Sequence, residues 1–194
     1  MKTPLFSFYL TGHIQKLLGI KPSSLKPHKE AEADGTLTEM WHTTWRLDHV
    51  ISSRDQHLVI AVNEHTSYSF LIPIFEGQGI DQIMNSFHEY WFDTLVKHGY
   101  LPKKKQQYKT QYLRGGNSRA ISNLSQLSYH AFHGIERGDS IPLIHAHIRS
   151  LPIKFNGKYD FPDVKFQQAL DEKTPPNLKK ISIPPSDNIT IFKN

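Results

Sequence analysis

Positive charge gathers in one stretch of the chain that holds no carboxylate. Between Asp93 and Glu136 there is no acidic residue but there are seven lysines and arginines; subtracting these from the net charge of +5 leaves the remainder about two charges negative. Such segregation indicates a face for an anionic partner. The residues that we expect to bind nucleic acid or another polyanion are Lys103, Lys104, Lys105, Tyr108, Lys109, Tyr112, Arg114, Gly115, Gly116 and Arg119.

Three features of this stretch suit an anionic ligand. Lysine and arginine neutralise phosphates, and tyrosines stack on unpaired bases, which is the combination found in single-stranded nucleic-acid sites. A glycine turn at Gly115 and Gly116 that opens a helix would present free backbone N–H groups between two arginines. The alternative interpretation is a solvated basic hairpin whose tyrosines pack on the core. Nucleic acid or an acidic protein is the partner that this pattern favours.

Twelve histidines offer a second kind of chemistry. His145 and His147 would share one face if their segment is a strand, and His130 and His133 are three apart on an expected helix, so both pairs could ligate a divalent metal. A metal-dependent hydrolase or nuclease is therefore the second hypothesis. Ordinary surface or hydrogen-bonded histidines are the competing explanation, because no His-Glu-x-x-His motif is present.

Other catalytic classes find little support in the sequence. There is no cysteine, which excludes disulfides, thiolate metal sites and a cysteine nucleophile. No phosphate-binding glycine motif and no Gly-x-Ser-x-Gly elbow occurs. We therefore expect a binding protein without a cofactor more than an enzyme.

The elements that must position these residues are a hairpin and two helices. Two apolar, β-branched runs within residues 57–74 flank a polar turn and predict a hairpin that is covered on both faces. Apolar residues at helical spacing predict helices at 80–98 and 118–135. Together they predict an α+β fold, a small and mostly antiparallel sheet with two amphipathic helices packed on it.

The remaining segments complete the expected organisation. A single domain should span residues 1–170, with a mobile loop at 21–35, where prolines, serines and mixed charges gather. Residues 141–151 fit a helix or a strand equally well. Residues 171–194 contain four prolines and predict an extended tail.

The surroundings of the protein follow from hydropathy. No run approaches the roughly 18 apolar residues that span a bilayer, so we expect no membrane partner and a cytoplasmic location. The helix at 80–98 is aromatic on more than one side, and it could serve as a protein-interaction surface or make a homo-oligomer. Core packing is the alternative for Phe87 and Trp91, and the exposure of Phe92 separates the two ideas.

Several motifs also resemble a known family. The sequence KLLG at 16–19, a tryptophan-bearing strand, Asn63, and TSYSFLIP at 66–73 before a long helix resemble an uncharacterised bacterial family of small α+β proteins, a domain of unknown function. The resemblance covers roughly residues 10–100. It implies the same α+β fold and carries no assigned activity. A long insertion at 21–40 and the tail after residue 170 depart from the family's shorter pattern.

Overall fold

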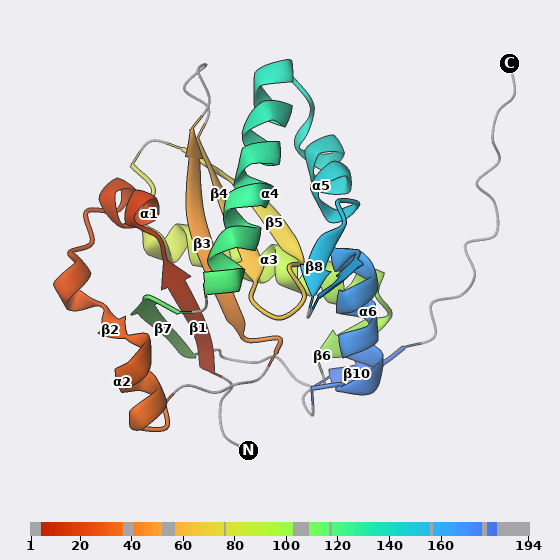
Figure 1. Ribbon diagram of the computed structural model, residues 1–194, viewed down its shortest axis with the longest axis horizontal. Coiled ribbons are helices and arrows are strands. Elements are labelled where there is room, and N and C mark those ends of the chain that lie inside the picture. The colour runs from red at the N-terminus through yellow and green to blue at the C-terminus, as the bar shows by residue number, and fades with distance from the viewer. Residues whose placement is uncertain are drawn as a thin grey trace, which may run out of the picture.

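A mixed β-sheet forms the centre of the molecule (Figure 1). The computed structural model describes residues 5–36, 41–51, 57–75, 77–102, 109–116, 118–155, 157–175 and 178–181. Within them, six strands make the main sheet in the order β2-β7-β1-β3-β4-β5. Their bounds are β1 Leu5–Leu10, β2 Lys26–Pro27, β3 Thr44–Ile51, β4 His57–Asn63, β5 Ser69–Ile74 and β7 Lys109–Arg114.

The sheet is antiparallel on one side and parallel on the other. β3, β4 and β5 form an antiparallel meander, in which β4 and β5 are the predicted hairpin. β1 runs parallel to both β3 and β7, and β2 runs parallel to β7. Two small antiparallel sheets pair β6 (Tyr100–Pro102) with β10 (Leu178–Lys180) and β8 (Ile153–Phe155) with β9 (Lys158–Asp160).

Helices cover both faces of the main sheet, and Figure 1 shows α4 in front of the strands and α3 behind them. One face packs against α3 and α6, and the other against α4 and α5. We call them the α3 face and the α4 face. The helices of the described chain are α1 Gly12–Leu17, α2 His28–Ala33, α3 Ile80–Lys97, α4 Ser118–Arg137, α5 Ile141–Arg149 and α6 Pro162–Glu172, with a 3-10 turn, η1, at Pro22–Ser24.

The central hairpin is apolar on both sides because both of its faces are covered. Along β4, Val59 and Ala61 belong to the cluster on the α3 face, whereas Leu58 and Ile60 belong to the cluster on the α4 face. All four are at least 95% buried. The period of two along a strand sends alternate side chains to opposite cores, and a sheet between two helix layers accepts apolar residues at every position.

The predicted α+β class and both long helices are confirmed. The sheet is larger than the expected small antiparallel sheet, because β1, β2 and β7 add a parallel half. Among the described residues, no helix has both the length and the apolar composition that a bilayer crossing requires.

Three segments either differ from the sequence prediction or resolve an ambiguity in it. Residues 21–35 are not a loop throughout, since they carry η1, β2 and α2, and Ala31 of α2 is buried against Tyr9 and Leu113. Residues 141–149 are helical, with Ile144 and Ile148 buried one turn apart. In the predicted tail, α6 extends to Glu172 and β10 pairs with β6, and residues 182–194 lie outside the described chain.

Candidate functional site

The predicted anion-binding turn connects β7 on the sheet to α4 on its face. β7 ends at Arg114, Gly115 and Gly116 turn the chain, and α4 begins at Ser118. Both glycines have positive φ, +84° and +104°, a region that side chains disfavour. At Gly116 an added Cβ would also collide with the Arg46 guanidinium and come within 3.3 Å of the Tyr9 ring. The two glycines therefore let the backbone fold tightly over residues of β1 and β3.

Arg46 of β3 fixes this turn from beneath. Its Nη1 donates to the Gly115 carbonyl oxygen at 3.0 Å, and its Nη2 donates to Glu64 Oε1 at 2.5 Å. The guanidinium lies 4.9 Å from the centroid of the Tyr9 ring. Arg46 is only 4% exposed, so the ion pair is shielded from solvent. Because Glu64 balances its charge, Arg46 positions the turn more than it attracts a ligand.

Tyr9 extends the buried polar network to α2. Its hydroxyl lies 2.5 Å from His28 Nδ1. Burial raises the pKa of the Tyr9 hydroxyl, and the charge of Glu64 raises it further. Tyr9 therefore keeps its proton and forms a neutral hydrogen bond with Nδ1, while His28 Nε2 lies 4.0 Å from Glu32 Oε2. The network ties α2, β1 and β3 to the turn that precedes α4.

A pocket of about 490 Å³ lies beside the first two turns of α4. It is lined by Ser118, Arg119, Ser122, Asn123, Lys154 and Gly157. These side chains can all donate hydrogen bonds except that of glycine, and none carries a carboxylate. The first turn of α4 also has no acidic residue, so the positive end of the helix dipole is not offset there. We call this site the α4 pocket.

Two cations beside the α4 pocket lack partners. Arg114 and Lys154 are exposed, and neither forms an ion pair or a side-chain hydrogen bond with the described residues. Asn123, by contrast, is buried and donates through Nδ2 to Ser67 Oγ at 2.9 Å. Ser67 has a positive φ of +56° in the β4–β5 turn, so this bond joins α4 to that turn. The pocket thus has a fixed wall and a lining cation, Lys154, while Arg114 adds a second cation at the adjoining β7–α4 turn, and neither is paired among the described residues.

The structure brings together only part of the predicted anion site. Arg114, Gly115, Gly116 and Arg119 meet at the β7–α4 turn, while Lys109 lies five residues away at the start of β7, roughly 17 Å at the rise of a strand. Tyr112 is half-buried against the core of the α3 face, and burial raises its pKa to about 12. The predicted residues Lys103, Lys104, Lys105 and Tyr108 lie outside the described chain.

The predicted histidine cluster does not form a metal site. Because residues 141–149 are a helix, His145 and His147 point in different directions: His145 Nε2 accepts a hydrogen bond from the Leu71 backbone N–H, and His147 lies near His130, ring centroids 5.4 Å apart. His133 packs against Tyr129. Within the described residues, no group of three or more potential ligands is arranged to hold a metal ion.

The aromatic helix α3 packs mainly into the core. Phe87 and Trp91 are almost fully buried, as core packing requires, and Phe92 is 47% exposed. The role of α3 as a protein-interaction surface stays a prediction.

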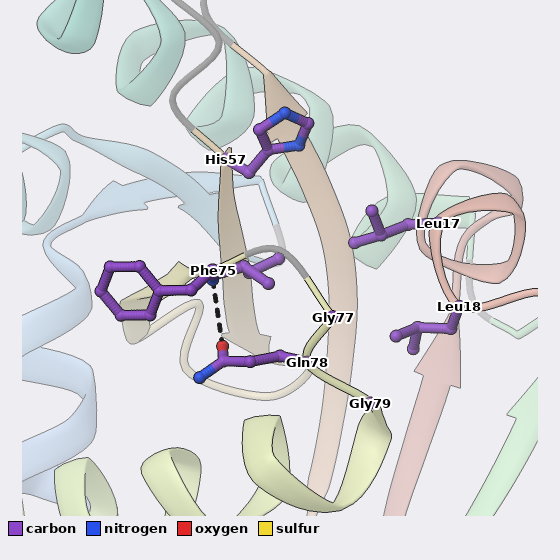
Figure 2. Close-up of a pocket in the computed structure, with 8 residues that line it drawn as sticks. Leu17, Leu18, His57, Phe75, Gly77, Gln78 and Gly79 are labelled. Atoms are coloured by element: carbon purple, nitrogen blue, oxygen red, sulfur yellow. Dashed lines mark hydrogen bonds between the residues drawn. The ribbon is translucent and has the colours of Figure 1, made fainter.

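Sequence reasoning missed a second site on the α3 face. Two adjoining pockets, about 740 and 480 Å³, share Leu17 and His57 as lining residues. Figure 2 shows Leu17 of α1 and Leu18, which follows it, facing Gly77 and Gln78 across the larger pocket, with His57 at one end. We call the two pockets together the α1–α3 groove.

Two histidines on neighbouring strands form the polar part of the α1–α3 groove. His49 Nε2 and His57 Nδ1 are 3.0 Å apart, and their rings stack at 5.1 Å. Burial lowers the pKa of His49, and the proximity of His57 lowers it further, whereas Asp48 opposes the shift. His57 pairs with Ile51 and His49 with Val59, so the two histidines are diagonal neighbours. The hairpin register, once known, would have revealed this pair.

Comparison with known proteins identifies the family but not an activity. No curated protein matches the chain. Residues 7–165, which include the β7–α4 turn, the α4 pocket and the α1–α3 groove, match the family described as "Domain of unknown function (DUF6933)". The expected uncharacterised family is thereby confirmed: the chain belongs to the DUF6933 family.

Proposed function

We propose that this protein binds the phosphate backbone of a nucleic acid at the α4 pocket and the β7–α4 turn. The observation that carries the proposal is the lining of the pocket, where hydroxyl, amide and cationic donors surround the start of a 20-residue helix and no described lining residue is a carboxylate. Phosphate groups favour helix N-termini and charged donors of this kind.

The roles of the individual residues follow from their surroundings. Arg114 and Lys154, exposed and unpaired among the described residues, neutralise phosphate charge from two sides. Ser118 and Ser122 supply neutral hydroxyl donors within the pocket. Arg46 holds the turn in shape through Gly115 without adding net charge, because Glu64 neutralises it.

Several features favour backbone contacts over stacking on bases. Tyr100 is 1% exposed and donates to Asp171 Oδ1 at 2.8 Å, and Tyr112 packs on the core, so both rings are occupied. The lysines at 103–105 precede β7 in the sequence and add charge to the same stretch of chain. Binding through phosphates alone is insensitive to sequence and strongly dependent on salt.

Fluorescence anisotropy with labelled single-stranded RNA, single-stranded DNA and duplex DNA tests the proposal. The observed binding constant should fall steeply as salt rises, and each phosphate contact contributes about 0.7–0.9 to the slope of log K against log salt. The variants Arg114→Gln and Lys154→Gln should each lower that slope by about one contact.

Lys179→Gln is the matched control, since Lys179 is an exposed lysine on β10 that lines none of these pockets. It should leave both affinity and slope unchanged. If none of the three nucleic acids binds at low salt, or if the control lowers the slope as much as Lys154→Gln does, the proposed site is wrong. If the protein binds an acidic protein and no nucleic acid, the nucleic-acid proposal is wrong and the anionic partner is a protein.

A further inference from the structure

The α1–α3 groove has a size and shape suited to a small molecule. Its two pockets, about 740 and 480 Å³, each fall within the range of roughly 300–1,000 Å³ typical of ligand sites. Strands β3 and β4 and the end of β5 make the floor, α1 makes one wall, and the turn that precedes α3 makes the other. Gln78 Oε1 accepts from the Phe75 backbone N–H at 3.1 Å, which fixes that turn (Figure 2).

Most of the groove is apolar. Leu17 and Leu18 project from α1 toward the opposite turn, as Figure 2 shows, and Ile51 and Ile74 add aliphatic surface from the sheet. Leu17 and Ile51 remain 36% and 48% exposed, respectively. Large aliphatic side chains that stay open to solvent around a concave surface favour an apolar ligand body.

The histidine pair supplies the polar end. One proton lies between His49 Nε2 and His57 Nδ1, because the 3.0 Å separation requires one nitrogen to donate and the other to accept. The outer nitrogens of the neutral pair then present one donor and one acceptor. The outer nitrogen that carries a proton can donate to an anionic group.

The charges that line the groove favour an anion. Lys16 is exposed and forms no ion pair with the described residues. His13 also lines the smaller pocket, and its Nδ1 lies 3.2 Å from Asp48 Oδ1, so that nitrogen already has a partner. Among the described residues that line the two pockets there is no carboxylate, and Asp81, in the first turn of α3, lies outside both linings.

We propose that the α1–α3 groove binds a small amphipathic carboxylate, whose head group meets Lys16 and His57 and whose apolar body lies along Leu17, Leu18 and Ile74. This site is separate from the α4 pocket, so the proposal does not depend on nucleic-acid binding. An apolar body alone would leave Lys16 and the histidine pair unused, and a cationic head would be repelled by Lys16.

Three eight-carbon probes that differ only in the head group test this inference: octanoate, octanol and octylamine. Binding is followed by the NMR signals of the histidine rings and the leucine methyl groups during titration. Octanoate should shift the signals of His57 and Leu17 in a saturable way. Octanol should bind more weakly, and octylamine should not shift these signals.

Paired variants assign the head and the body of the ligand. Lys16→Met keeps the aliphatic stem and should weaken octanoate about fivefold, the usual size of an exposed charge contact, while octanol changes less than twofold. Lys158→Met is the control for lost charge. Leu17→Asn should weaken octanoate and octanol alike, and Leu143→Asn, at a leucine that is 56% exposed on α5, is its control.

The outcomes decide the inference. Saturable octanoate binding that Lys16→Met weakens and Lys158→Met leaves intact supports it. It is overturned if octanoate causes no saturable shift, if octylamine binds as tightly as octanoate, or if Lys16→Met has no effect. The Lys16→Met protein should still bind nucleic acid. That result would show that a failed octanoate test does not count against the proposed nucleic-acid function.

Discussion

Replacing Gly116 with alanine tests whether the β7–α4 turn and the buried Arg46 form one structural unit. Gly115 and Gly116 both have positive φ, but an added Cβ at Gly115 meets nothing within 4 Å, whereas at Gly116 it collides with the Arg46 guanidinium. Gly115→Ala should therefore lower the free energy of unfolding only by the strain of placing a side chain at positive φ, about 1–2 kcal/mol. Gly116→Ala should cost that plus displacement of Arg46 from Glu64, about 3–5 kcal/mol for breaking a buried ion pair.

The measurement is the free energy of unfolding from urea denaturation, followed by circular dichroism, with Gly115→Ala as the matched control. We expect the Gly116 variant to be less stable than the Gly115 variant by roughly 3 kcal/mol. In the background Arg46→Met with Glu64→Gln, which removes the guanidinium and its partner, the extra cost of Gly116→Ala should disappear. Equal costs for the two glycines in the native background would refute the account.

Three further perturbations probe other contacts. Burial and the charge of Arg149 lower the pKa of His145 from 6.5 to about 3. Between these two pH values the His145 side chain is protonated in the unfolded chain and neutral in the native chain. The contribution of His145 to stability should fall by about 1.4 kcal/mol per pH unit as the pH drops below 6.5, and His145→Gln should reduce the slope from urea melts at several pH values by that amount. Asn63→Ala, which loses three hydrogen bonds in the β4–β5 turn and two to the carbonyl oxygens of Trp41 and Thr44, should cost at least about 3 kcal/mol by thermal melting, against about 1 kcal/mol for Asn123→Ala. Arg149→Met uncovers a carbonyl on the edge strand β5 and should promote self-association in light scattering, which Arg137→Met should not do.

Local patterns predicted the central hairpin, from two apolar runs around a polar turn, and the two long helices, from apolar residues at helical spacing. The parallel half of the sheet has no comparable signal: β1 pairs with β7 at Leu5 and Lys109, more than a hundred residues apart. In α5 the sequence was ambiguous for a physical reason. Ile144 and Ile148 satisfy both a period of two and a helical spacing of four, and only packing against α4 selects the helix.

The candidate sites also contain some residues that the sequence could predict and others that it could not. Arg114 and the two glycines are contiguous, so their turn could be predicted, but Lys154 reaches the α4 pocket from β8 and its position depends on the tertiary fold. Arg46 did leave a trace in the sequence. It stands between Trp45 and Leu47, so it lies on the opposite face of the strand from these two apolar residues, and a charged residue in a covered strand indicates a buried polar partner.

Asp48 on β3 connects the elements of the two sites, and its replacement should affect them unequally. It accepts hydrogen bonds from Thr11 at 2.5 Å, and it lies 3.2 Å from His13 and 3.3 Å from Ser128 of α4. α1 is a helix of six residues, too short to be stable without anchors, so losing the carboxylate should loosen α1 and with it Lys16.

α4 has 20 residues and an apolar stripe buried on the sheet, so losing one hydroxyl contact should not move it. Asp48→Asn should therefore weaken octanoate binding by roughly tenfold, the equivalent of one charged hydrogen bond, and leave nucleic-acid binding within twofold. A parallel loss of both activities in a protein with a native circular dichroism spectrum would mean that β3 transmits changes between its two faces. In that case the two sites could not be treated as independent.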